Sequence, residues 1–232
     1  EAERLGRELG KAVLAGMENL NFTDDVVLAG SLKSLDLKQR QLPSAKQAEA
    51  ILATSRTEYE RLKDAGAGQA QVRTAEVSVF GAEAQLKLAH AQQSGELDRL
   101  LARLRPFEVQ VLRIGNACVV GWPGEFFAEY GLQLKQRAAM RSFVVTYTNG
   151  ELQGYIVTPE AASRGGYEAA SSLFGPETGA AMISTAVAAI SELAGEHPGE
   201  IPPKQGLPLD PHNRSRRREE AESPGSQSHP PP

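Results

Sequence analysis

The hydrophobic periodicity of this chain changes at Pro106. Before it, apolar residues mostly recur at the three- and four-residue spacing of amphipathic helices. The exception is an extended apolar run at residues 26–37, which predicts a strand. After Pro106, apolar and polar residues alternate, as they do in a half-buried strand, and helical spacing returns later. Since both periods occur in one chain, we expect a mixed α/β fold in which helices pack on a mixed sheet.

The helices of the first half have clear boundaries in the sequence. Leu5, Leu9, Val13 and Met17 recur every four residues and predict a helix over residues 1–20. A second helix is expected to begin at Ser44, where Gln47 completes a capping box. The stretch "DAGAG" at residues 64–68 should end it, and a third helix should run towards "QQSG" at residues 92–95. A short helical turn, "ELDRLLARL", then leads to Pro106.

The second half alternates strands with helices. Gly115-Asn116 is a two-residue hairpin turn between apolar strands at residues 107–114 and 117–121. Helical spacing starts again at Glu125. A strand is expected at residues 142–148 and an extended segment at residues 154–160. Residues 164–179 predict a loop with a short helix. A final helix should follow Pro176, with Ile183, Val187 and Ile190 facing inward.

Composition excludes several classes of protein. The net charge of −4 and the pI of about 5.7 provide no basic field for recruiting nucleic acid. The one cysteine, Cys118, excludes a disulfide framework within the chain and predicts a buried free thiol. We find no apolar run that approaches the roughly 20 residues of a membrane span. The chain opens inside a helical pattern, so we expect it to be cut from a longer protein, and its localisation stays open.

The last part of the chain differs from the rest. Residues 198–232 hold 9 of the 14 prolines and almost no large apolar side chains. Such a segment cannot bury enough surface to offset the entropy cost of ordering it. We therefore predict one domain over residues 1–197 and a Pro-rich disordered tail over residues 198–232.

No residue type identifies a reaction by its spacing alone. The histidines, His90, His197, His212 and His229, have no metal-ligand spacing, and no HExxH, CxxC, GxGxxG or GxSxG motif occurs. Glu125 is either a charge that complements a helix start or a ligand held at a strand end. For Tyr155 and Tyr167, the apolar patterns around them favour core packing, with the hydroxyl at the edge of the core.

Three stretches together resemble the neutral/alkaline ceramidase family, whose members are zinc amidases that cleave N-acylsphingosine. They are "VVGWPGEFFAEYGLQLKQR" at residues 119–137, "FVVTYTNGELQGYIVT" at 143–158 and "GGYEAASSLFGPETG" at 165–179. The family shows a PGE at a strand end, an NxYxxYI-like stretch and then a YEAAST-like loop, in this order and at similar spacing. The resemblance covers about residues 1–194 and implies the C-terminal half of a ceramidase-like catalytic domain.

The resemblance also implies roles for individual residues. Glu125, in the PGE, and Tyr155, before Ile156, would be ligands of Zn²⁺, and Tyr167 would contact the scissile amide as a catalytic and substrate-binding residue. Zinc accepts oxygen donors and lowers the pKa of bound water towards neutrality. A phenol hydroxyl near the carbonyl oxygen can stabilise the developing oxyanion.

This sequence departs from the family pattern in ways that predict partners. The two remaining zinc ligands of the family are histidines of an N-terminal half that is absent here. That half would be the partner of this chain, and it would cover apolar strand faces at residues 107–121 and 142–148. Ceramide or a related lipid amide would be the substrate, with peripheral membrane contact. The segment between Asn149 and Tyr155 is one residue longer than in the family, and Trp122 replaces a smaller residue. The alternative is a non-catalytic binding module with this scaffold, or a relative that acts on another amide.

Overall fold

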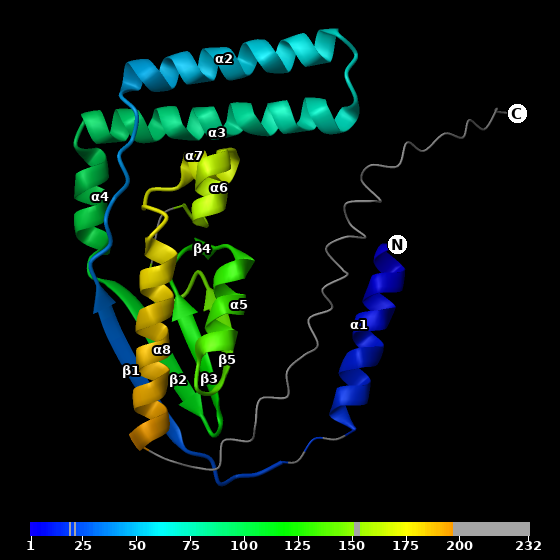
Figure 1. Cartoon of the computed structure of the whole chain (residues 1–232), viewed down its shortest axis with the longest axis vertical. Helices are drawn as coiled ribbons and strands as arrows, with labels where there is room; N and C mark the ends of the chain where they lie inside the picture. Colours follow the sequence, from blue (N-terminus) through cyan, green and yellow to red (C-terminus); the bar gives the residue numbers. More distant parts are fainter. Residues whose placement is uncertain (19, 21, 151–153, 197–232) are drawn as a thin grey trace, which may run out of the picture. The chain divides into compact units, whose positions relative to one another are not determined.

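The computed structural model describes residues 1–196 except 19, 21 and 151–153. It has helices and a mixed sheet, which confirms the α/β prediction. The predicted disordered tail lies outside the described residues, so it stays a prediction. Figure 1 labels most of the helices and strands along the chain.

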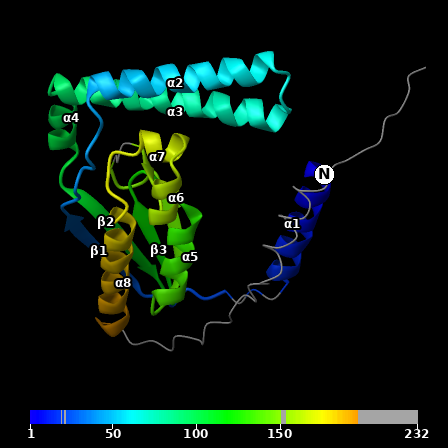
Figure 2. The ribbon, with the colours of Figure 1, turned by 45° about the horizontal axis from the view of Figure 1, so that its top comes forward.

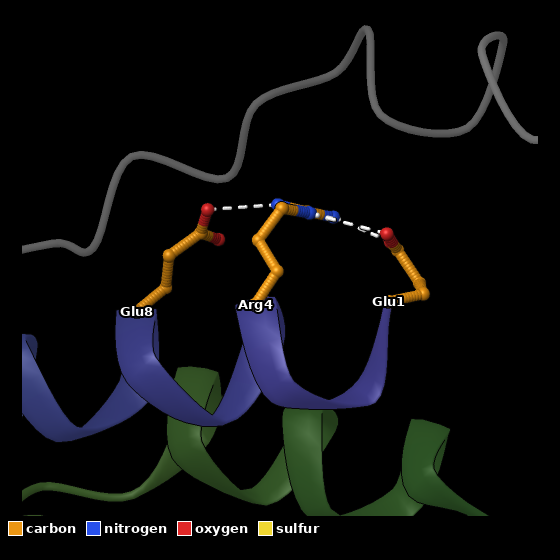
Figure 3. Close-up of polar contacts among 3 residues, drawn as sticks. All are labelled: Glu1, Arg4 and Glu8. Atoms are coloured by element: carbon orange, nitrogen blue, oxygen red, sulfur yellow. Dashed lines mark hydrogen bonds and ion pairs between the residues drawn. The ribbon is translucent and has the colours of Figure 1, made fainter.

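The helix predicted at the start of the chain is present as α1 (Ala2–Met17), and none of its residues is buried. Its polar side carries a row of ion pairs in which Arg4 contacts Glu1 and Glu8, the latter at 2.7 Å (Figure 3). Its apolar stripe, which includes Leu5 and Leu9, is exposed. Helix α1 is therefore amphipathic, but its apolar side does not pack against the core of the described residues.

The main sheet has four strands in the order β1-β2-β3-β5 (Figure 1). They are β1 (Leu28–Leu35), β2 (Phe107–Ile114), β3 (Ala117–Trp122) and β5 (Arg141–Thr146). Strand β2 is antiparallel to both β1 and β3, and β3 is parallel to β5. The Gly115-Asn116 turn joins β2 to β3, as the sequence predicts, and the sheet is mixed.

A helical segment separates β1 from β2 in the sequence. It consists of α2 (Ala45–Asp64), α3 (Gln69–Gln93) and α4 (Glu96–Leu104). Helices α2 and α3 run side by side in both views (Figures 1 and 2). The capping box is formed: the Gln47 backbone N–H donates to Ser44 Oγ at 3.3 Å, and the Ser44 N–H donates to Gln47 Oε1 at 2.9 Å. Local sequence therefore sets the start of this segment.

One face of the sheet is covered by helices α5 (Ala128–Arg137) and α8 (Thr178–Glu196). Buried side chains of α8, including Ile183 and Ile190, pack in one core cluster with Val109, Val111 and Val120 from the sheet. Cys118 is fully buried on this face, as predicted, and its thiol donates to Met140 Sδ at 3.6 Å. This cluster is the core that the inward residues of the last helix predict.

Helix α8 corrects the expectation about membrane spans. Thr178–Gly195 is long and apolar enough to cross a membrane by length and composition, with a mean hydropathy of 1.2. Five of its side chains are fully buried in the core, namely Met182, Ile183, Ala186, Ala189 and Ile190. The apolar character of α8 is thus accounted for by packing against the sheet.

The opposite face of the sheet is apolar and exposed. Leu112 is 44% exposed and Phe143 is 51% exposed, and both lie on one row with Val119 of the strand between them. The exposed apolar side chains of this face are Leu28, Leu32, Leu112, Ile114, Phe143 and Val145. The expectation that strands of the second half leave apolar faces exposed is confirmed.

Candidate functional site

Glu125 lies on a short strand and not at a helix start. Residues Glu125–Phe126 form β4, which pairs in parallel with β6 (Tyr155–Ile156), and Glu125 is the direct partner of Tyr155. The Phe127 N–H donates to the Ile156 carbonyl at 3.2 Å and extends this pairing. Helix α5 begins only at Ala128, with Phe127 as its N-cap. The prediction that helical structure begins at Glu125 is therefore wrong, because pairing with β6 keeps this segment extended.

The turn before Glu125 is tied to the end of β5. The Tyr147 N–H donates to the Gly124 carbonyl, and the Thr148 N–H donates to the Trp122 carbonyl, both at 3.1 Å. These bonds hold Tyr147 at φ +56°, a left-handed conformation that is rare for a bulky side chain. Backbone strain of this kind, at a cost of about 1–3 kcal/mol, clusters at functional sites. The strained backbone directs the Tyr147 hydroxyl to the Glu125 carboxylate, to which it donates a hydrogen bond.

Tyr167 reaches the same place from a third segment. It begins the short helix α7 (Tyr167–Ser171), which follows α6 (Pro159–Arg164). Its ring packs edge-on against the Tyr155 ring, with ring centroids 5.8 Å apart. The structure thus brings together Glu125, Tyr155 and Tyr167, the three residues that the resemblance implies. The rings of Tyr155 and Tyr167 are half-buried and do not belong to the two core clusters. The roles of the two tyrosines stay predictions.

Two close backbone contacts fix the relative positions of these segments. A Cβ atom on Gly154, which has φ +80°, would lie 2.4 Å from the carbonyl oxygen of Ser171. A Cβ atom on Gly81 of α3 would lie 3.0 Å from Tyr167 Cα. Helix α7 is therefore pressed between α3 and the residue that precedes Tyr155. A side chain at Gly154 would move one tyrosine relative to the other.

The surroundings of Tyr147 and Tyr155 keep these two phenols protonated at pH 7. The hydrogen bond to Glu125 is the main cause that raises the pKa of Tyr147 to about 12. Burial, together with a hydrogen bond with Glu125, raises the pKa of Tyr155 to about 12. A nearby carboxylate disfavours a second negative charge, so these groups act as neutral donors at pH 7. A bound cation would have the opposite effect on the pKa of both hydroxyls.

The donor set matches part of a zinc coordination sphere. The Glu125 carboxylate and the Tyr155 phenol are adjacent oxygen donors, whereas catalytic zinc normally has three protein ligands. Among the described residues, no group of three or more His, Cys, Asp or Glu side chains could hold a metal ion. His90 is exposed on α3, and the other histidines lie outside the described part. A zinc ion bound by these two oxygen ligands would need further ligands from other residues.

The sequence did not predict that Tyr147 belongs to this cluster. For Trp122 it showed only that a large residue replaces a smaller one of the family pattern. The signal for Tyr147 is its position at a strand end, just before the Asn149-Gly150 turn. Trp122 is fully buried with its ring centroid 4.7 Å from that of Phe126, and its indole N–H has no hydrogen-bond partner within the described residues. An unpaired buried donor costs about 1–3 kcal/mol.

Comparison with known proteins gives limited similarity. No protein-family model matches the chain, and no curated protein matches it. The crystal structure of neutral ceramidase from Pseudomonas aeruginosa is 30% identical over 40% of this chain and 16% of that chain, with a TM-score of 0.34. A ceramidase complexed with C2 is 29% identical over 38% of this chain and 15% of that chain, also with a TM-score of 0.34.

The chain spans only a small part of the length of these ceramidases. The matched part spans 16% and 15% of the lengths of the two ceramidases. The chain therefore has sequence similarity to two ceramidases over about two fifths of its length.

Proposed function

We propose that this chain is part of a zinc-dependent amidohydrolase that resembles neutral ceramidase. It would hydrolyse the N-acyl amide of ceramide or a related lipid amide to a fatty acid and a sphingoid base. The observation that supports this most is the pairing of Glu125 with Tyr155 across β4 and β6, with the Tyr167 ring against Tyr155. These are the residues to which the motif resemblance assigns ligand and amide-binding roles, and they come from three separate segments.

In this proposal zinc, when bound, supplies a Lewis acid and a source of activated water. Glu125 provides a negative charge and an oxygen donor, and Tyr155 provides the second oxygen donor beside it. Tyr147 orients the carboxylate through its hydrogen bond to Glu125 Oε2. Tyr167 donates its hydroxyl proton in a hydrogen bond to the carbonyl oxygen of the amide, where negative charge develops during attack.

The proposal requires a partner for this chain. Two oxygen ligands leave the metal without the imidazoles that most catalytic zinc sites use. A missing N-terminal half would supply two His ligands and would cover apolar surface that the described residues leave exposed. Since the substrate is a lipid amide, the assembled enzyme would contact a membrane peripherally. On this view the isolated 232-residue chain is inactive and binds zinc weakly.

One observation favours a second candidate, a non-catalytic module with this scaffold. Tyr147 and Tyr155 both hydrogen-bond to Glu125, so the protein itself provides partners for this carboxylate. Carboxylates held in this way also occur as purely structural clusters. In that case Glu125 would fix the turn after β3, and the tyrosines would carry no reaction. A related enzyme with a different amide substrate is compatible with the same cluster.

The test compares variants in the product of the complete gene. Hydrolysis of a fluorescent ceramide and bound zinc are measured for wild type, Glu125→Gln and Tyr155→Phe, with and without a chelator. We expect both variants to lose bound zinc and to lose activity by about 100-fold or more, since each lacks one ligand. Glu129→Gln is the matched control, because Glu129 is exposed four residues away on α5.

Two outcomes would reject the proposal. One is full zinc content and full activity in Glu125→Gln, which would return Glu125 to a structural role. The other is a complete gene product that neither binds zinc nor cleaves any lipid amide, which would favour the non-catalytic module. Zinc-dependent cleavage of another amide but not of ceramide would keep the reaction class and change the substrate.

A further inference from the structure

We propose that a cavity at Arg40 binds a small oxyanion, the carboxylate or phosphate group of a soluble ligand. The cavity has a volume of about 340 Å³ and lies between the helices α2 and α3 on one side and the α6–α7 segment on the other. Its lining includes Arg40, Ser55, Gln85 and the pair Gly165-Gly166. It is separate in its lining residues from Glu125 and Tyr155, so the inference does not depend on the proposed function.

Arg40 is a half-buried cation that is held by two backbone carbonyl groups. Its Nε donates to the Ser172 carbonyl at 2.5 Å and its Nη2 to the Ala170 carbonyl at 2.7 Å. Both acceptors are neutral. Within the part of the chain that the structure describes, no carboxylate lies within ion-pair distance of the Arg40 guanidinium, whereas Arg56 pairs with Glu83 at 2.8 Å. Burial without a compensating anion lowers the pKa of Arg40.

The guanidinium has donors to spare. Arginine carries five N–H groups in a planar fork, and the two bonds to carbonyls use only one edge of it. The Nη1 group makes no hydrogen bond within the described residues. Carboxylate and phosphate match this fork in geometry and charge, and either would supply the missing counter-charge. The bare edge of Arg40 is therefore the feature that selects an oxyanion over a neutral ligand.

The rest of the cavity lining is neutral. Ser55 of α2 and Gln85 of α3 offer a hydroxyl and an amide, and neither side chain has another hydrogen-bond partner among the described residues. No Asp or Glu side chain is part of this lining. A carboxylate lies beside this lining: Glu168 Oε2 is 4.0 Å from the position of a Cβ on Gly166. The negative charge of Glu168 at the edge of the cavity should weaken anion binding. Removing that charge should therefore strengthen binding, which is the opposite of the effect expected when the charge of Arg40 is removed.

Occupancy would act on the candidate site through α7. Ala170 and Ser172, the acceptors of Arg40, lie in the same short segment as Tyr167. The backbone of Arg40 adds a bond, since its N–H donates to the Leu173 carbonyl at 2.9 Å. An oxyanion bound to the free edge of Arg40 would lock the guanidinium that holds this segment. Binding should therefore stabilise α7 and be visible in its amide signals.

The experiment titrates the 232-residue chain with sodium phosphate and, separately, with sodium acetate, against sodium chloride at equal ionic strength. Binding is followed by ¹H–¹⁵N NMR at Gly165, Gly166 and Ala170 and by the melting temperature. We expect saturable shifts at these amides with phosphate or acetate and none with chloride. The stronger of the two anions identifies the ligand class.

Variants decide whether Arg40 carries the binding. Arg40→Gln should weaken affinity at least tenfold, and Glu168→Gln should strengthen it. Arg40→Gln also removes the bonds to α7, so Ser55→Leu provides a second variant that fills the cavity and leaves those bonds in place. It should abolish binding with an unchanged circular dichroism spectrum. Arg99→Gln, an exposed arginine of α4, is the matched control. Shifts that do not saturate would overturn the proposal, and so would a wild-type affinity in either Arg40→Gln or Ser55→Leu.

Discussion

The two faces of the four-stranded sheet are built from the same kind of residue and have opposite environments. On one face, Val109 and Val111 are fully buried beneath α8. On the other, Leu112 and Phe143 are about half exposed. A strand that carries apolar residues on both faces is typical of a sheet that is buried on both sides. The difference shows that α5 and α8 complete only half of the packing that these strands are suited to make.

The largest expected difference between the faces is in thiol reactivity. Cys118 is fully buried on the covered face, and burial raises the pKa of its thiol. Reaction with a thiol reagent should require unfolding, so it should be at least about 10³-fold slower than that of the thiol introduced by Leu112→Cys. Labelling followed by mass spectrometry separates the two sites. Comparable rates in the folded protein would mean that the covered face is open.

The next largest effect is on stability, and it can be compared at two phenylalanines, one on each face of the sheet. Phe107 is 2% exposed and packs edge-on against Phe174, with centroids 5.1 Å apart, whereas Phe143 lies on the exposed face. Phe107→Ala should lower the free energy of unfolding by about 3–5 kcal/mol. Phe143→Ala should lower it by less than about 1 kcal/mol. Urea denaturation of both variants measures this, and equal losses would contradict the comparison.

A smaller effect is expected where the covered face meets the segment after β6. The buried Tyr130 hydroxyl donates to the Val157 carbonyl at 2.8 Å. Burial, aided by the charges of Glu160 and Glu129, raises the pKa of Tyr130 to about 12. Because the pKa is about 10 in the unfolded chain, the stabilisation is complete below pH 10 and is lost as the pH rises from 10 to 12.

Tyr130→Phe tests that linkage. At pH 7 the variant should be less stable by about 1–2 kcal/mol, since it leaves the Val157 carbonyl without this donor. The difference from wild type should shrink between pH 10 and 12, where Tyr130 ionises in the wild-type protein. Tyr147 and Tyr155 titrate in the same range in both proteins and cancel in the difference. A difference that grows with pH would show that the sign is wrong.

The smallest change in stability is expected on the exposed face. Leu112→Glu places a charge at a solvent-accessible position and should change the free energy of unfolding by less than about 0.5 kcal/mol. It should reduce self-association, because exposed apolar patches drive contacts between molecules. Light scattering across a concentration series measures this, with Lys87→Glu at an exposed position of α3 as a control. A large loss of stability would mean that this face is packed.

Much of the fold was predictable from the sequence because its signals are local. Ser44 and Gln47 form their capping box within four residues, and the Gly115-Asn116 turn fixes the hairpin of β2 and β3. The alternation after Phe107 was also sufficient to assign a buried face. In each case the residues that determine the structure are neighbours in the chain, so a single window of sequence contains the information.

The candidate site was less predictable because its geometry is non-local. The extended conformation of Glu125 depends on Tyr155, and helical spacing in the following residues masked it. The position of Tyr147 depends on hydrogen bonds to the turn before Glu125. The prediction that Glu125, Tyr155 and Tyr167 come together was based on the family resemblance, because the hydrophobic periodicity contains no signal for it. Their roles in binding zinc and substrate stay predictions.

The pairing of β1 with β2 has a consequence for the kinetics of folding. Leu35 is the partner of Phe107, although three helices separate them in the sequence. The β2–β3 hairpin closes through a two-residue turn, and the α2–α3 hairpin is equally local, so both can form early. To pair with β2, strand β1 must close a loop that contains all of α2, α3 and α4, and a longer loop has a larger entropy cost of closure. We expect β1 to dock last, so the nascent sheet passes through a three-stranded stage whose β2 edge is open to other chains.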